Sequence, residues 1–177
     1  GKFGHLLGRV HKGFARAIHL IEPFNLDPRD WTTYKALDPH PRTPDHVLYM
    51  SVNKNGSKVF SAELITEGRV RFLTESMKAL ENRMNFRIEA LIFDPSAYND
   101  DQHMQQKSVG SQLFDAGENW IRGSKDLMAG IKRTDDALYY ELKAGILVRE
   151  PEVYIFKTLY TTIKQLEEYV WSDYRGV

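Results

Sequence analysis

The chain has 177 residues, of which 42% are hydrophobic, and this composition suits one globular domain and argues against general disorder. Its 24 basic and 24 acidic side chains balance, so binding to nucleic acid or to an acidic membrane would need a local patch. The absence of cysteine excludes disulfides, thiol catalysis and cysteine-ligated metal sites.

The first 46 residues are expected to form an amphipathic helix and a proline-rich arm, ahead of an α+β globular domain over residues 47–177. Apolar side chains recur at steps of four and three across residues 3–21, which is the spacing of one helix face. This segment is basic, with no acidic residue before Glu22, so it could face a membrane surface or nucleic acid. Residues 22–46 hold five of the chain's seven prolines, which predicts an irregular arm anchored by Trp31.

A β-hairpin is predicted over residues 47–65, because residues 55–56 are Asn-Gly, a strong turn signal. A two-residue loop would mix apolar and polar side chains on each face, whereas a three-residue loop over residues 54–56 gives one apolar face. We therefore expect the three-residue loop, with the cross-strand pairs Met50–Phe60 and Leu48–Ala62. The opposite face is expected to be solvated, and it carries Tyr49, Ser51, Ser61 and Glu63.

The middle of the chain is expected to alternate strands and helices. A third strand over residues 69–73 leads into a helix over 74–84 that ends at Asn85, and residues 86–93 are apolar on both faces near their end, which is typical of a central strand. A long polar loop follows over 94–110. Three of its residues could hold a divalent cation, although such loop charges are more often simply solvated: Asp100, Asp101 and His103.

Residues 111–133 are expected to be helical, with a break near Gly123. Residues 137–142 and 146–148 are then expected to form two short strands or one bent strand, with Gly145 as a turn or a bulge, and a helix over 135–144 is the alternative.

A long amphipathic helix is predicted over residues 150–173, where Pro151 suits the first turn and apolar residues recur at steps of three and four. Such a stripe covers a sheet of its own domain more often than it forms a coiled coil. The expected fold is α+β, with an antiparallel sheet of about five strands packed against this C-terminal helix and peripheral helices around it.

One catalytic pattern stands out, because phosphate-binding glycine loops, paired helical histidines and the serine nucleophile motif are all missing. Glu141 and Lys143 form an E-x-K on a possible strand, and Asp94 ends an earlier strand. This arrangement resembles that of nucleases of the restriction-endonuclease type. The resemblance implies a magnesium-dependent nuclease in which Asp94 and the E-x-K of Glu141 and Lys143 act together to bind Mg²⁺ and polarise water.

A basic surface is a second candidate site. Arg69 and Arg71 lie two residues apart on an expected strand, near Lys54 and Lys58 of the hairpin. Together with the N-terminal helix they could contact phosphates, and Tyr49 could stack on a base. The alternative is a solvated sheet edge whose charges discourage further strand pairing.

The interpretation favoured by the sequence is a non-enzymatic assembly protein, comparable in size and surface to viral matrix, capsid or tail scaffolds, that self-associates or docks in a larger complex. No cofactor and no metal are expected. A nucleic-acid-binding module and the nuclease are the alternatives. Without a membrane-span-length apolar run or a signal-peptide pattern, we expect an intracellular (cytoplasmic) or virion-associated protein, with peripheral membrane contact open. The proposed oligomer contacts are Phe3, Leu7, Val10, Phe14, Trp31, Phe156, Leu159, Ile163, Leu166 and Val170.

Overall fold

A mixed sheet of seven strands, in the order β1-β9-β4-β3-β2-β5-β6, forms the centre of the computed structural model. The structure describes residues 8–39, 44–67, 69–94 and 107–171. Three consecutive antiparallel strands form the middle of the sheet, and parallel pairs extend it on both sides. The strands are β1 (Leu20–Ile21), β2 (Trp31–Asp38), β3 (Asp45–Asn53), β4 (Lys58–Thr66), β5 (Ile88–Phe93), β6 (Trp120–Arg122) and β9 (Val153–Phe156).

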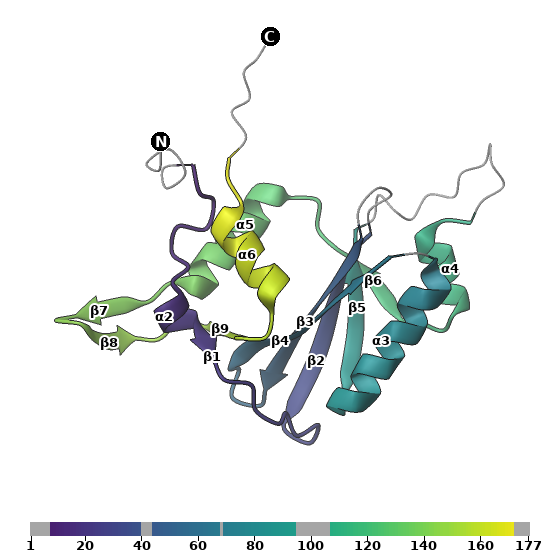
Figure 1. Ribbon diagram of the computed structural model, residues 1–177, viewed down its shortest axis with the longest axis horizontal. Helices are drawn as coiled ribbons and strands as arrows, with labels where there is room; N and C mark the ends of the chain where they lie inside the picture. Colours follow the sequence, from purple (N-terminus) through teal and green to yellow (C-terminus); the bar gives the residue numbers. More distant parts are fainter. Residues whose placement is uncertain (1–7, 40–43, 68, 95–106, 172–177) are drawn as a thin grey trace, which may run out of the picture.

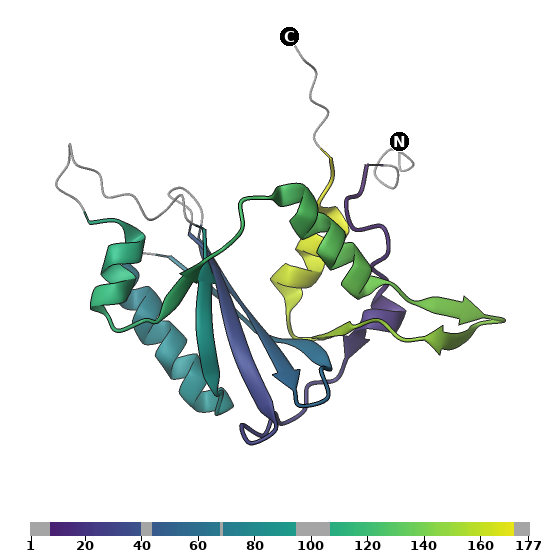
Figure 2. The same ribbon diagram turned by 180° about the vertical axis from the view of Figure 1, so that it is seen from behind.

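Helices lie on both sides of this sheet (Figures 1 and 2). On one side are α3 (Val70–Met84) and α4 (Val109–Asp115), and on the other are α5 (Leu127–Leu138) and α6 (Tyr160–Glu168), with the short α2 (Arg16–His19) beside β1. Two apolar clusters result, one under α3 and one around β9 and α6. The first includes Leu37, Leu73, Met77, Leu91 and Phe93, and the second includes Phe14, Ile155, Phe156, Leu159 and Ile163.

The β3–β4 hairpin confirms the predicted three-residue loop. Met50 pairs with Phe60, and Gly56 has a φ of 84°, the left-handed conformation that this loop needs. A register irregularity after Tyr49 then pairs Leu48 with Glu63, so the expected Leu48–Ala62 pair is wrong. The expectation of a solvated opposite face is also wrong, because α3 covers Tyr49, and Ser51 and Ser61 are buried as well. The irregularity turns Glu63 to the other face, where it contacts the start of α6. The hydroxyl of Ser51 forms hydrogen bonds with the hydroxyl of Thr33 at 2.7 Å and with the hydroxyl of Ser61 at 2.9 Å.

The predicted fold class is wrong, because the sheet is mixed and no long C-terminal helix packs against it within the described residues. The first part of residues 150–173 is the strand β9, which lies between β1 and β4 and is almost entirely buried. A strand that is buried on both faces has a continuous apolar sequence without alternation. Periodicity alone does not distinguish such a sequence from a segment of a buried helix. The same core explains the N-terminal segment, where Val10 and Phe14 are buried without belonging to a helix.

The expected proline-rich arm contains β2, a strand in the middle of the sheet that pairs with both β3 and β5. The expected boundary after residue 46 falls inside the paired β2–β3 region, so both sides of it contribute to one sheet. Residues 69–73, expected as a strand, instead begin α3. The end of α3 is confirmed, since Asn85 has a φ of 52° and caps the helix in the left-handed conformation.

The expected helix over 111–133 is replaced by α4, β6 and the first part of α5. After α5 the chain forms a separate two-stranded sheet of β7 (Glu141–Lys143) and β8 (Ile146–Arg149), with Gly145 in the turn, one of the two roles expected for it. This hairpin projects away from the seven-stranded sheet (Figure 1). Within the described residues, none of the helices is long and apolar enough to cross a membrane.

Candidate active site

Two aspartates lie side by side where β2 and β5 end. Leu37 pairs with Phe93 in the parallel β2–β5 ladder, and an aspartate follows each of them. Neighbouring strands are about 4.8 Å apart. Leu37 and Phe93 are buried towards α3, so the alternation of side chains turns Asp38 and Asp94 to the opposite face, and both are exposed. The ladder therefore brings two carboxylates together at one edge of the sheet.

Packing on the other face fixes the position of β2. Lys35 is 1% exposed, and its Nζ lies 2.7 Å from Glu81 Oε1 and 2.9 Å from Glu118 Oε2. Glu81 belongs to α3, and Glu118 lies just before β6. The ion pairs of Lys35 therefore connect β2 to α3 and to the loop that leads into β6. The hydroxyl of Tyr49 donates to Glu81 Oε1 at 3.0 Å. Burial, and next the Glu81 carboxylate, raise the pKa of Tyr49 far above its ordinary value.

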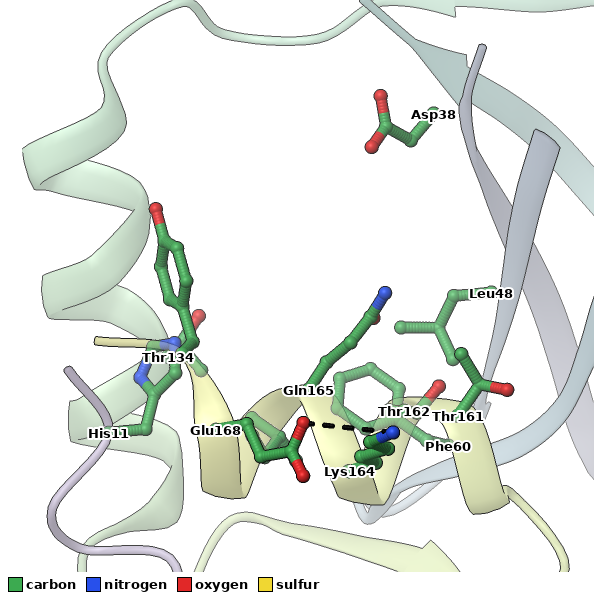
Figure 3. Close-up of a pocket in the computed structure, with 12 residues that line it drawn as sticks. His11, Asp38, Leu48, Phe60, Thr134, Thr161, Thr162, Lys164, Gln165 and Glu168 are labelled. Atoms are coloured by element: carbon green, nitrogen blue, oxygen red, sulfur yellow. Dashed lines mark ion pairs between the residues drawn. The ribbon is translucent and has the colours of Figure 1, made fainter. Parts of the chain in front are cut away.

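Asp38 borders a groove of about 830 Å³ between the sheet and α6 (Figure 3). Leu48 and Phe60 contribute apolar side chains from β3 and β4, and α6 lines the groove with Thr161, Thr162, Lys164 and Gln165. Across the β2–β3 pair, the residue opposite Asp38 is His46. The groove thus gives Asp38 an open space on one side, lined by both apolar and polar side chains.

A carboxylate from β4 fixes the start of α6. Glu63 Oε1 accepts a hydrogen bond from the Thr161 amide at 2.9 Å, and Oε2 accepts from the amide and hydroxyl of Thr162 at 2.8 and 2.7 Å. The first amides of a helix have no partner within it, and the helix dipole favours negative charge there. His46 Nε2 lies 3.6 Å from Glu63 Oε2, which is beyond hydrogen-bond length, and this buried nitrogen has no hydrogen-bond partner within the described part of the chain.

The structure does not bring Glu141 and Lys143 to Asp94. Both lie on β7 in the projecting hairpin, whereas Asp94 follows β5 in the main sheet (Figure 1). Glu141 accepts a hydrogen bond from the hydroxyl of Tyr139 at 2.9 Å, which raises the pKa of Tyr139, and it lies 3.7 Å from Arg149. The carboxylate beside Asp94 is Asp38. Sequence reasoning missed it because Asp38 was placed in the arm.

The four basic candidates are divided between two ends of β4. Lys54 and Lys58 flank the β3–β4 turn, where they lie 3.1 Å from Asp30 and 3.4 Å from Glu152. Arg69 and Arg71 lie beyond the other end of β4, at the start of α3, and Arg71 pairs with Glu75 at 2.9 Å. The structure therefore divides these residues between two locations.

Most of the proposed oligomer contacts are buried inside the chain's own core. Val10 and Phe14 are buried at the N-terminal side, and Phe156, Leu159, Ile163 and Leu166 belong to the cluster around β9 and α6. Trp31 is partly buried against that cluster, and Val170 remains exposed. Phe3 and Leu7 lie outside the described residues, as do Asp100, Asp101 and His103.

The Asp38–Asp94 pair provides oxygen ligands of the kind that Mg²⁺ and Mn²⁺ prefer. Two adjacent carboxylates repel each other, and a divalent cation relieves that repulsion. Among the described residues, no group of three or more histidine, aspartate or glutamate side chains is placed to hold a metal ion. The donor set on this edge is thus a carboxylate pair, which suits a cation that also takes ligands from water or phosphate.

No protein-family model matches the sequence, and no curated protein is significantly similar to it. Solved structures do match. The large terminase of a thermophilic bacteriophage aligns over 93% of this chain with a TM-score of 0.70 and 15% identity, and the chain spans 38% of that protein. The P22 large terminase nuclease domain aligns over 92% of this chain and 79% of its own length, with a TM-score of 0.67 and 15% identity.

The large terminase nuclease from the thermophilic phage G20c covers 93% of this chain and 83% of its own length, with a TM-score of 0.58 and 10% identity, and it has also been solved with bound zinc. These nuclease neighbours, together with the burial of the apolar stripes, overturn the interpretation as a non-enzymatic scaffold. At these identities the likeness concerns architecture. The fold of this chain is therefore that of the large terminase nuclease domains, the RNase H-like fold.

Proposed function

We propose that this chain is a metal-dependent nuclease domain that hydrolyses phosphodiester bonds at the Asp38–Asp94 pair. The observation that carries the proposal is the β2–β5 register, which sets two exposed carboxylates side by side at the ends of adjacent parallel strands. The solved neighbours described as nucleases support it, because they share the fold that creates this edge.

Asp38 and Asp94 would hold Mg²⁺ or Mn²⁺ through their carboxylate oxygens. When bound, such an ion supplies charge stabilisation at the phosphoryl oxygen and lowers the pKa of a coordinated water. The chain's own contribution is geometric. The Lys35 ion pairs fix β2 on the α3 face of the sheet, and backbone pairing with β5 fixes it within the sheet. The two carboxylates are therefore positioned before substrate binds.

The proposed substrate is DNA, within a longer phage protein of the large terminase type. The support is the match to phage large terminases, since this chain spans only 38% of the thermophilic bacteriophage protein. A nuclease of this kind would act in an infected cell or in association with virions, so the intracellular or virion-associated location remains a prediction.

The proposal is tested by cleavage of linear and supercoiled DNA with Mg²⁺ or Mn²⁺. We expect Asp38→Asn and Asp94→Asn each to reduce cleavage at least about 100-fold, since each removes a charged ligand. Glu141→Gln is the matched control, because it neutralises a carboxylate on the projecting hairpin and should leave the rate unchanged. Cleavage that persists in EDTA, or that survives both aspartate substitutions, would refute the proposal.

A further inference from the structure

A small basic cleft lies at the end of the sheet where β2 begins. It has a volume of about 250 Å³, and its lining consists of three basic residues, one acidic residue and four neutral ones: Arg29, Lys54, Arg87, Asp30, Thr32, Tyr34, Val52 and Asn53. Thr32, Tyr34 and Asp38 occupy alternate positions of β2 and therefore share one face of the sheet. The cleft and the carboxylate pair are thus at opposite ends of the same strand face.

The charges of this cleft favour an anion. Arg29 lies 2.6 Å from Asp27, and Lys54 lies 3.1 Å from Asp30, so two of its three cations already have carboxylate partners. The Arg87 guanidinium has no ion-pair partner within the described ranges, which leaves an excess of one positive charge. Arginine is well suited to phosphate because its planar group donates two parallel hydrogen bonds.

Asn53 adds a neutral donor to the cleft. Its side-chain oxygen accepts hydrogen bonds from the amides of Asn55 and Ser57, each at 2.9 Å. These bonds fix which end of the side chain faces the loop, so the amide nitrogen is the end left to donate elsewhere. A ligand with several oxygen acceptors and a negative charge matches this set of donors.

The spacing between the cleft and the carboxylates matches a nucleic-acid backbone. Six residue steps separate Thr32 from Asp38, which at about 3.3 Å per residue is roughly 20 Å. B-form DNA rises about 3.4 Å per base pair, so this distance corresponds to about six base pairs. Between the two sites the face presents Ala36 on β2, which is exposed, and Ala90 and Ile92 on β5, which are half-buried.

We propose that this cleft binds a backbone phosphate of the DNA substrate, about six nucleotides from the bond that is cut at Asp38 and Asp94. The inference rests on the proposed nuclease function for its substrate. It assigns the main phosphate contact to Arg87, with Lys54, Arg29 and Asn53 around it. Of the basic residues singled out in the sequence, only Lys54 belongs to this site.

The first test measures binding of a labelled DNA duplex of roughly 30 base pairs to the full chain in EDTA, as a function of salt concentration. Arg87→Ala should weaken binding about fivefold to tenfold and lower the slope of log affinity against log salt by about one, because each phosphate contact contributes about that much. Arg87→Lys should keep the slope. Arg83→Ala is the matched control, since it removes an exposed arginine from the last turn of α3, on the other side of the sheet.

The second test replaces single phosphates of the duplex by uncharged methylphosphonates. The affinity of the wild type should fall when the phosphate about six nucleotides from the mapped cut is replaced. The affinity of Arg87→Ala should be unchanged by the same replacement. If the wild type cuts but Arg87→Ala binds like Arg83→Ala, the phosphate site is overturned and the nuclease proposal stands. If the Arg87 effect appears in a wild type that never cuts, the phosphate site stands as a binding site and the nuclease proposal fails.

Discussion

The ammonium group of Lys35 lies 2.7 Å from the carboxylate of Glu81, with the lysine on a central strand and the glutamate on the helix that covers it. Glu118 lies 2.9 Å from the same nitrogen, so one buried cation forms ion pairs with two acidic side chains. Burying charges is costly unless they are paired, and removing one partner leaves the others without compensation.

Replacing Lys35 by methionine should therefore destabilise the fold by about 3–5 kcal/mol, because Glu81 and Glu118 would remain buried without their cation. Urea unfolding followed by circular dichroism measures this change. Lys132→Met is the control, since Lys132 pairs with Asp136 on an exposed face of α5 and its loss should leave the unfolding midpoint unchanged. If the unfolding midpoint of Lys35→Met is also unchanged, the ion pairs of Lys35 with Glu81 and Glu118 add nothing to stability.

The raised pKa of Tyr49 predicts a loss of stability at alkaline pH. The phenol stays neutral in the folded protein but ionises near pH 10 in the unfolded chain, so its contribution is present below about pH 10 and is lost as the pH rises further. The difference in unfolding free energy between the wild type and Tyr49→Phe should therefore shrink between about pH 9 and pH 11. A difference that stays constant across this range would contradict the burial of the hydroxyl beside Glu81.

Loss of the Glu63 carboxylate should loosen the start of α6. Glu63→Ala removes three hydrogen bonds at the helix N-terminus, and a destabilisation of about 1–2 kcal/mol is expected. Hydrogen exchange should accelerate at the amides of Thr161 and Thr162. Glu168→Ala, at the exposed other end of α6, should leave their exchange rates unchanged. Equal protection in the two variants would mean that another group caps the helix.

Local signals predicted the parts of this fold that depend on short-range geometry. The Asn-Gly turn determined the β3–β4 loop and the Met50–Phe60 pair, and Asn85 marked the end of α3. Local signals do not show which strands pair when they are far apart in the sequence. In β2, a charged Lys35 occupies a buried position, so the apolar alternation that identifies a half-buried strand is interrupted. Only the later acidic residues, Glu81 and Glu118, make that position tolerable.

For the same reason the sequence did not reveal the pairing of Asp38 with Asp94. Asp94 was predicted to end a strand, but its partner could be found only by knowing that β2 and β5 are parallel neighbours. One signal was present in the sequence, since Asp38 and Asp94 are each followed by proline after an apolar stretch. An Asp-Pro step is common where a strand ends and a loop begins, so by itself it does not identify a pair.

The β2–β5 ladder contains one irregularity, since Thr33 pairs with Ile88 but Tyr34 pairs with Ala90, which leaves Glu89 as an extra residue. A regular continuation from Thr33 would set Asp38 level with Phe93, and the second aspartate would then sit one step beyond the first and point to the α3 side. A single unpaired amino acid thus decides whether this edge of the sheet carries one acid or two. Lengthening β5 by one residue after Ala90 would separate the acids without altering either of them.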